Sequence, residues 1–286
     1  MSDERSVKDL FREWRGGNAE AGQAMAQRFA DWYYAIATSR LGEERGRRPC
    51  EVACEKFGEG IVSVADARSL VGWAHEIVNG EVDKAGTRAT DGDEPNAFTA
   101  NQSPKALLDS VRDAVGSELQ LLEAVYGGRA TDQQIDALAK PFGGNPLGVL
   151  RARYRVKQVL RDRHGAPFEV APDQPILDRK PLPLYESGRM APAEESGFEQ
   201  WMISDLDLCK DIAEFAHFAI ALRGGLGPPR SNAPAASRPT LHTPVQSPDN
   251  DGLAIAGLSG MALVAVGMSV FALMLVLAAA AAMFMR

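Results

Sequence analysis

The chain has 286 residues and a formal net charge of −7. The net charge of individual segments differs from this overall value. Its three cysteines, Cys50, Cys54 and Cys209, are odd in number and sparse, which argues against a disulfide framework and fits a reducing compartment. Because no His or Cys near Cys50 and Cys54 completes a set of zinc ligands, we expect small buried thiols there and no metal site.

The first block, residues 6–80, carries apolar side chains at the spacing of helices. Two faces are separated by a break at which Asn18 is the expected N-cap: Val7, Leu10, Phe11 and Trp14 before it, and Ala21, Met25, Phe29, Trp32 and Ile36 after it. Further helices are predicted over 50–57 and 65–78. No stretch of the sequence shows strict strand alternation, so the predicted fold class is all-α, with two small helical domains.

Composition divides residues 81–252 into further segments. A polar linker over 81–102 precedes a second helical domain over 103–165, and a connector over 166–198 has six prolines between 166 and 192, which disfavours regular helix. An amphipathic helix is predicted over 199–222, followed by a flexible tether over 223–252.

The amphipathic pattern over 199–222 leaves three arrangements open: packing on the soluble domains, a dimer seam, or a position on the membrane surface. Its polar side is acidic, with Asp205, Asp207, Asp211 and Glu214. An acidic face is a poor match for an anionic bilayer. Packing against protein is therefore favoured.

The last segment, residues 253–285, has 33 positions without a charged side chain. A bilayer core of ~30 Å needs ~20 such residues, so the sequence predicts one transmembrane helix at the C-terminus; the alternative is a buried helix of a soluble domain. Small residues at four-residue spacing, such as Ala256 and Gly260, would let two such helices dimerise, although this spacing also arises by chance in an Ala-rich span.

The N-terminus is charged where a signal peptide has an apolar core. The expected arrangement is a tail-anchored, single-pass protein of the inner (cytoplasmic) membrane with its N-terminal region in the cytoplasm.

The strongest functional pattern of the soluble part begins at residue 130. Thr131 is expected to cap a helix over 132–139, a Gly-Gly break follows, and Asn145 is expected to cap a second helix that starts at Pro146. Between 146 and 164 there are six cations and one anion, a local charge of +5. Two helices around a Gly-containing turn, the second basic, are typical of a helix-turn-helix.

Basic residues on a helix also form ordinary solvated faces. The turn, the caps and the local charge favour DNA contact over that interpretation, through Arg151, Arg153, Arg155, Lys157 and Arg161. Of these, Arg151 and Arg155 are the best candidates for base contacts.

Catalytic chemistry has little support in the sequence. The four histidines are scattered, and no glycine pair is followed by the Lys-Ser/Thr of a phosphate loop. We therefore predict no catalytic residue and no cofactor.

Several segments together resemble the extracytoplasmic-function sigma factors of bacterial RNA polymerase. The N-terminal part of that family's sequences resembles residues 10–14 (LFREW), 17–21 (GNAEA) and 28–34 (RFADWYY) of this chain. The family's Asp-Leu-x-Gln-Glu-x-Phe segment resembles residues 51–57 (EVACEKF). Residues 67–79 resemble the helix that the family uses on the melted −10 element, and 119–126 with 155–161 resemble the domain that reads the −35 element. The resemblance covers about residues 7–164.

The resemblance implies two helical domains on a flexible linker, with DNA and the RNA polymerase core as partners. Polymerase docking would fall to Glu51, Cys54, Glu55 and Phe57, with Glu51 where the family has Asp and Cys54 where it has Gln. Strand opening uses aromatic and cationic side chains, and the corresponding helix offers only Trp73 as an aromatic, in register with apolar neighbours that place its ring toward the core. The rival interpretation is a membrane adaptor that keeps the fold for protein contacts without promoter opening.

Overall fold

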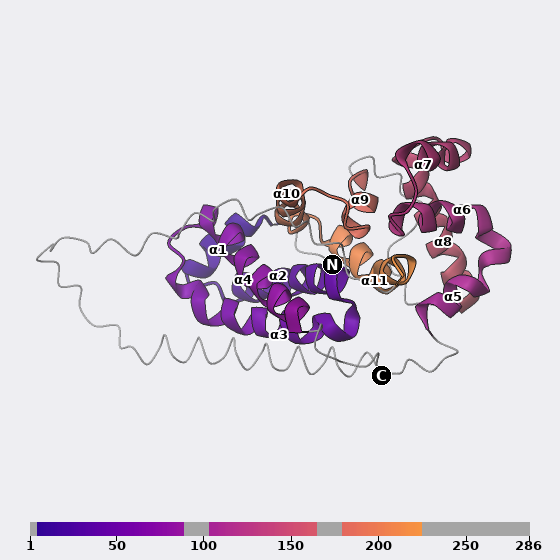
Figure 1. The fold of residues 1–286 in the computed structure, drawn as a ribbon. Helices are drawn as coiled ribbons and strands as arrows, with labels where there is room; N and C mark the ends of the chain where they lie inside the picture. Colours follow the sequence, from indigo (N-terminus) through magenta and orange to yellow (C-terminus); the bar gives the residue numbers. More distant parts are fainter. Residues whose placement is uncertain (1–4, 89–102, 165–178, 225–286) are drawn as a thin grey trace, which may run out of the picture. The chain divides into compact units, whose positions relative to one another are not determined.

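A computed structural model of the chain describes residues 5–88, 103–164 and 179–224. All regular structure in these ranges is helical, which confirms the predicted all-α class (Figure 1). All of these described residues belong to one compact unit, and residues 225–286 lie outside the described ranges.

The first bundle consists of α1 (Val7–Arg15), α2 (Ala19–Leu41), α3 (Glu43–Gly60) and α4 (Ala67–Arg88), with a 3₁₀ turn, η1 (Ile61–Ser63), between the last two. Helix α2 packs against the other three helices. Its predicted cap is confirmed, because the side chain of Asn18 accepts hydrogen bonds from the backbone N–H groups of Glu20 and Ala21. The predicted apolar face of α2 is buried: Ala21, Met25, Phe29, Trp32 and Ile36.

Two boundaries in this bundle differ from the prediction. Helix α3 begins seven residues before position 50 and contains Pro49, which is buried and has no backbone N–H to donate. Helix α4 continues to Arg88, into the segment predicted as a linker from residue 81. The remainder of that linker, 89–102, lies outside the described residues.

The second bundle consists of α5 (Pro104–Ser110), α6 (Arg112–Tyr126), α7 (Asp132–Ala139), the 3₁₀ turn η2 (Lys140–Phe142) and α8 (Leu147–His164). Thr131 caps α7 as predicted, in a reciprocal arrangement with Gln134. Helix α8 begins one residue later than predicted, directly after Pro146.

The C-terminal part of the described chain consists of α9 (Leu182–Glu186), α10 (Pro192–Met202) and α11 (Leu206–Leu222). The predicted connector over 166–198 is therefore partly helical: prolines stand at the starts of α9 and α10, where the missing N–H costs no intrahelical bond. The prediction of one continuous helix over 199–222 is wrong. It is interrupted at Asp205, whose non-helical backbone and carboxylate cap the start of α11.

Helix α11 belongs to both hydrophobic cores. Its first half, including Leu208 and Ile212, is buried with residues of the first bundle. Its second half, including Phe215 and Leu222, is buried with residues of the second bundle. Packing of this helix against protein, favoured from the sequence, is thus what the structure shows: α11 contacts α2 on one side and α5 and α6 on the other.

None of the helices within the described ranges is long and apolar enough to cross a bilayer. The predicted transmembrane helix, 253–285, and nearly all of the predicted tether, 223–252, lie outside those ranges. The membrane prediction therefore stays a prediction.

The crossing of α2 and α3 generates a first test. A Cβ atom added at Gly46 would lie 2.8 Å from the backbone carbonyl of Ala37, whereas one added at Gly58 on the same helix would meet nothing within 4 Å. We expect Gly46→Ala to lower the free energy of unfolding by about 1–3 kcal/mol, since backbone cannot move aside as a side chain can. The matched Gly58→Ala variant should gain roughly 0.5–1 kcal/mol. Urea denaturation measures both, and equal effects would contradict the close crossing.

Candidate nucleic-acid interface

Helices α7 and α8 meet at a tight turn. Gly143 has a left-handed backbone (φ +105°), and Arg151 of α8 donates to the carbonyl oxygen of Phe142 at 2.9 Å across this turn. A Cβ atom at Gly148 would lie 2.6 Å from the carbonyl oxygen of Ala139, so the two helices approach closely. The turn that the sequence indicates is therefore present, and Arg151 fixes its geometry.

The five predicted DNA contacts lie on different faces of α8. Arg151 and Arg155 are exposed and Arg161 is half-buried, while Arg153 and Lys157 are fully buried. Positions two residues apart on a helix differ by about 200°, so the exposed and buried pairs point in nearly opposite directions. Arg153 and Lys157, both predicted as DNA contacts, are thus buried, and neither reaches a phosphate in this conformation.

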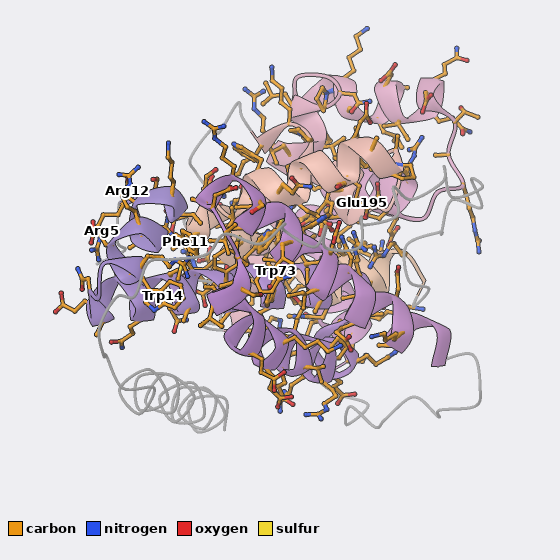
Figure 2. The ribbon with its side chains drawn as sticks, turned by 90° about the vertical axis from the view of Figure 1, so that its left-hand side faces the viewer. Arg5, Phe11, Arg12, Trp14, Trp73 and Glu195 are labelled. Carbon is orange, nitrogen blue, oxygen red and sulfur yellow. The ribbon has the colours of Figure 1, made fainter. Side chains whose placement is uncertain are left out.

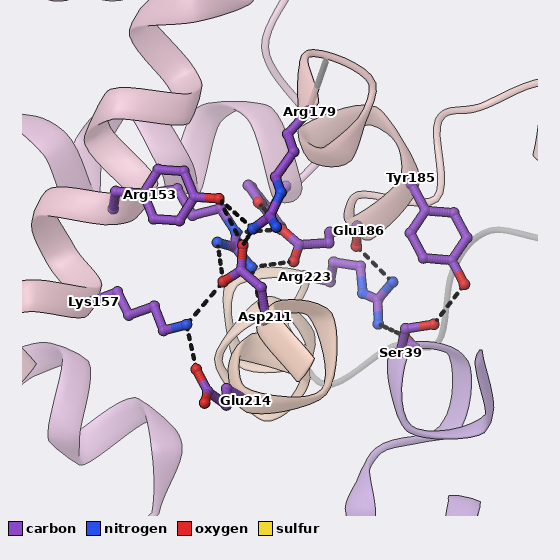
Figure 3. Close-up of polar contacts among 11 residues, drawn as sticks. Ser39, Arg153, Lys157, Arg179, Tyr185, Glu186, Asp211, Glu214 and Arg223 are labelled. Carbon is purple, nitrogen blue, oxygen red and sulfur yellow. Dashed lines mark hydrogen bonds and ion pairs between the residues drawn. The ribbon is translucent and has the colours of Figure 1, made fainter. Parts of the chain in front are cut away.

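The two buried cations are held by carboxylates of α9 and α11 (Figure 3). Arg153 donates two hydrogen bonds to Glu186, from Nη2 to Oε1 at 2.7 Å and from Nε to Oε2 at 2.9 Å. Its Nη1 donates to Asp211 Oδ1 at 2.9 Å. Lys157 Nζ donates to the same Asp211 oxygen at 2.8 Å and also pairs with Glu214. Such charge-assisted, bidentate contacts are among the stronger hydrogen bonds in proteins.

The second oxygen of Asp211 is also satisfied. Tyr154 donates to Oδ2 at 2.6 Å and Arg179 at 3.0 Å. Tyr126 of α6 donates to Glu186 Oε2 at 2.6 Å. The result is a buried polar cluster, called here the Asp211 cluster, which consists of Tyr126, Arg153, Tyr154, Lys157, Arg179, Glu186, Asp211 and Glu214.

Charge compensation keeps this cluster ionised. Burial alone would raise the pKa of Asp211, but the charges of Arg153 and Lys157 outweigh burial and hold that pKa well below its usual range. For Glu186 burial prevails over the attraction of Arg153, and its pKa is raised. Burial would lower the pKa of Arg153, yet the facing Asp211 and Glu186 raise it, so the guanidinium stays charged.

A second buried carboxylate ties α10 to the first bundle. Glu199 is fully buried and accepts from Arg40 Nη2 at 2.7 Å and from Tyr185 at 2.9 Å. His75 Nε2 lies 2.7 Å from Glu199 Oε2, and Trp32 Nε1 donates to the Glu199 backbone oxygen at 2.6 Å. Burial opposes ionisation of Glu199, but Arg40 and His75 outweigh it and lower its pKa.

The predicted polymerase-docking residues lie on α3. Glu51 and Glu55 are exposed on one face of the helix, and Cys54 beside them is half-buried. Phe57 is a core residue, with its ring centroid 4.4 Å from that of Phe29. Exposed acids with a buried aromatic beneath them form a surface that a partner can contact, and the docking prediction remains a prediction.

The ring of Trp73 packs within the first bundle (Figure 2). It is partly buried, its centroid lies 5.7 Å from that of Phe57, and a Cβ atom added at Gly60 would come within 2.6 Å of the ring. Its position agrees with the register predicted from the sequence and makes Trp73 a packing residue.

Sequence reasoning did not find Glu186, Glu199 or the role of Asp211. The available signal was the position of Asp211 between Leu208, Ile212 and Phe215, on the apolar side of its helix. A carboxylate at such a position is rarely buried without a cationic partner.

No protein-family model, curated protein or solved structure matches this chain. Among the described residues, no group of three or more His, Cys, Asp or Glu side chains is placed to hold a metal ion. The candidate site is therefore described from its own geometry alone. One face of α8 is basic and exposed, and the cations of the opposite face are buried and neutralised by carboxylates.

The Asp211 cluster predicts a pH-dependent loss of stability. At pH 7, Asp211→Asn should lower the free energy of unfolding by about 3–5 kcal/mol, because buried cations lose their counter-charge. A carboxylate whose pKa is depressed on folding stabilises the protein above its unfolded pKa of ~3.9 and loses that contribution as the pH falls further. The wild-type advantage should therefore shrink below about pH 4.

Denaturant titrations of wild type and variant at neutral and acidic pH measure this difference. Asp207→Asn is the matched control, since it removes the same charge from an exposed position of α11 and should change stability by no more than ~0.5 kcal/mol. A wild-type advantage that stayed constant down to pH 3 would contradict the ionised cluster.

Proposed function

We propose that the chain is a membrane-tethered, sigma-factor-like transcription protein that binds duplex DNA through α8 and the RNA polymerase core through α3. The observation that carries this proposal is the exposed pair Arg151 and Arg155 on α8, next to a tight turn and a capped α7. Lys140, in the turn before α8, is exposed as well. Cations grouped in this way supply phosphate contacts.

The order of the two bundles supports the same function. Four helices precede a second bundle that ends in the helix–turn–helix-like pair, which is the arrangement that the sequence resemblance implies. Glu51 and Glu55 give the first bundle an exposed acidic surface for the polymerase. The apolar segment 253–285 would anchor the protein in the cytoplasmic membrane, with the described helices in the cytoplasm and a homodimer through the span as a further option.

The second candidate function is a tail-anchored adaptor that uses the same helices for protein contacts and does not open promoters. The burial of Arg153 and Lys157 favours it, because two of the five predicted DNA contacts are neutralised internally. The packing role of Trp73 favours it too, since α4 then offers no aromatic free to hold a flipped base.

DNA binding is tested with the full chain in detergent micelles. Arg151→Ala combined with Arg155→Ala should weaken duplex binding and reduce the slope of log K against log salt by about 0.9 for each lost phosphate contact. Arg48→Ala, an exposed cation of α3, is the control and should leave the slope unchanged. Equal affinity and slope in the double variant and wild type would favour the adaptor.

Polymerase binding is a separate test. Glu51→Lys combined with Glu55→Lys should reduce capture of purified core enzyme about tenfold or more, a loss of ~1.4 kcal/mol or more in binding. Glu20→Lys, at an exposed position of α2, should leave capture unchanged. Absence of any core capture by the wild-type chain would refute the sigma-like function.

A further inference from the structure

Residues 179–224, which comprise α9, α10 and α11 and are called here the C-terminal segment, contact both bundles. Helix α11 packs against α2 of the first bundle and against α5 and α6 of the second. Glu199 binds Arg40 of α2, while Asp211 binds Arg153 and Lys157 of α8. The two bundles are thus joined through a segment that follows them in the chain.

Its charge is complementary to that of α8. The C-terminal segment has a formal charge of −3, and residues 147–164 of α8 have +5. Carboxylates that take a guanidinium through two parallel hydrogen bonds use the donors that a phosphate would use. Glu186 and Asp211 therefore compete directly with a polyanion for Arg153 and Lys157.

The contacts extend beyond α8. Arg223 at the end of α11 donates to the backbone oxygens of Glu186 and of Ser39 in α2, at 2.8 and 3.0 Å (Figure 3). Tyr185 of α9 lies 2.9 Å from the Ser39 hydroxyl. While these contacts hold, α9 and α11 keep the two bundles in one fixed relation.

In sequence, the C-terminal segment is the described part that lies nearest the predicted transmembrane helix. Its last residue, Gly224, is separated from residue 253 by 28 residues.

We propose that the C-terminal segment is an autoinhibitory element, whose carboxylates occupy Arg153 and Lys157 and hold the two bundles together until the segment is displaced. The inference rests on the proposed function, because that function identifies the competing anion as duplex DNA. Displacement frees two cations of α8 for phosphate contact and releases the bundles from each other.

The test measures duplex DNA binding and hydrogen exchange of the full chain in detergent micelles. Asp211→Asn should raise hydrogen exchange in α11 and steepen the log–log salt slope by about 1.8, the value expected for two additional phosphate contacts. Adding Lys157→Ala to this variant should remove about 0.9 of that gain. Asp207→Asn, the exposed control on the same helix, should behave as wild type.

Circular dichroism checks that the variants keep their helices, and two further measurements apply if Asp211→Asn unfolds. Glu186→Gln replaces the other carboxylate of Arg153 with an amide of the same shape and should steepen the slope by about 0.9. In the wild-type chain, saturating duplex DNA should increase hydrogen exchange in α11.

The outcomes separate the two proposals. DNA binding with the same slope in all folded variants, and no change of α11 exchange when DNA is added, would overturn autoinhibition while leaving DNA binding intact. An opened α11 without any DNA binding would overturn the proposed function, and the inhibitory role with it.

Discussion

The ionised carboxylate of Asp211 is the group on which the arrangement of α8 and α11 depends. It is fully buried and accepts hydrogen bonds from Arg153, Lys157, Arg179 and Tyr154. Removing one partner of a buried ion pair leaves a charge that water cannot reach, which costs several kcal/mol. Arg153 and Lys157 of α8 can therefore stay buried only while this carboxylate faces them.

Apolar packing and buried charge have different roles along α11. Ala219 and Leu222 supply contacts that any well-shaped apolar side chain could supply, while Asp211 accepts only partners in the right positions. Replacing a buried ion pair by apolar residues is often neutral or stabilising, so an ionic contact is weak evidence for stability alone. We hypothesise that the cluster serves specificity and release: it fixes one register of α11 on α8 and is sensitive to a competing anion.

The sequence predicts local structure well where the cause is local. The caps at Asn18 and Thr131 depend on neighbours within three residues, and the apolar face of α2 follows from its spacing. The pairing of Arg153 with Asp211 spans 58 residues, and periodicity along α8 does not reveal which of its cations has a buried partner. Asp205 is a different case: its carboxylate accepts from the N–H of Leu208, three residues on, so the signal for this helix start is local, and the prediction of one continuous helix overlooked it.

Helix α11 makes one cooperative unit of two bundles that the sequence predicts as separate domains. The most direct measurement is urea unfolding of a Trp201→Phe variant, which removes the tryptophan of α10, followed by two probes. One is the fluorescence of Trp14, Trp32 and Trp73, which all lie in the first bundle, and the other is hydrogen exchange of α6, whose Leu119 and Leu122 are buried in the second core. We expect the two transitions to coincide. Two separate midpoints, with the tryptophans and α6 unfolding independently, would contradict it.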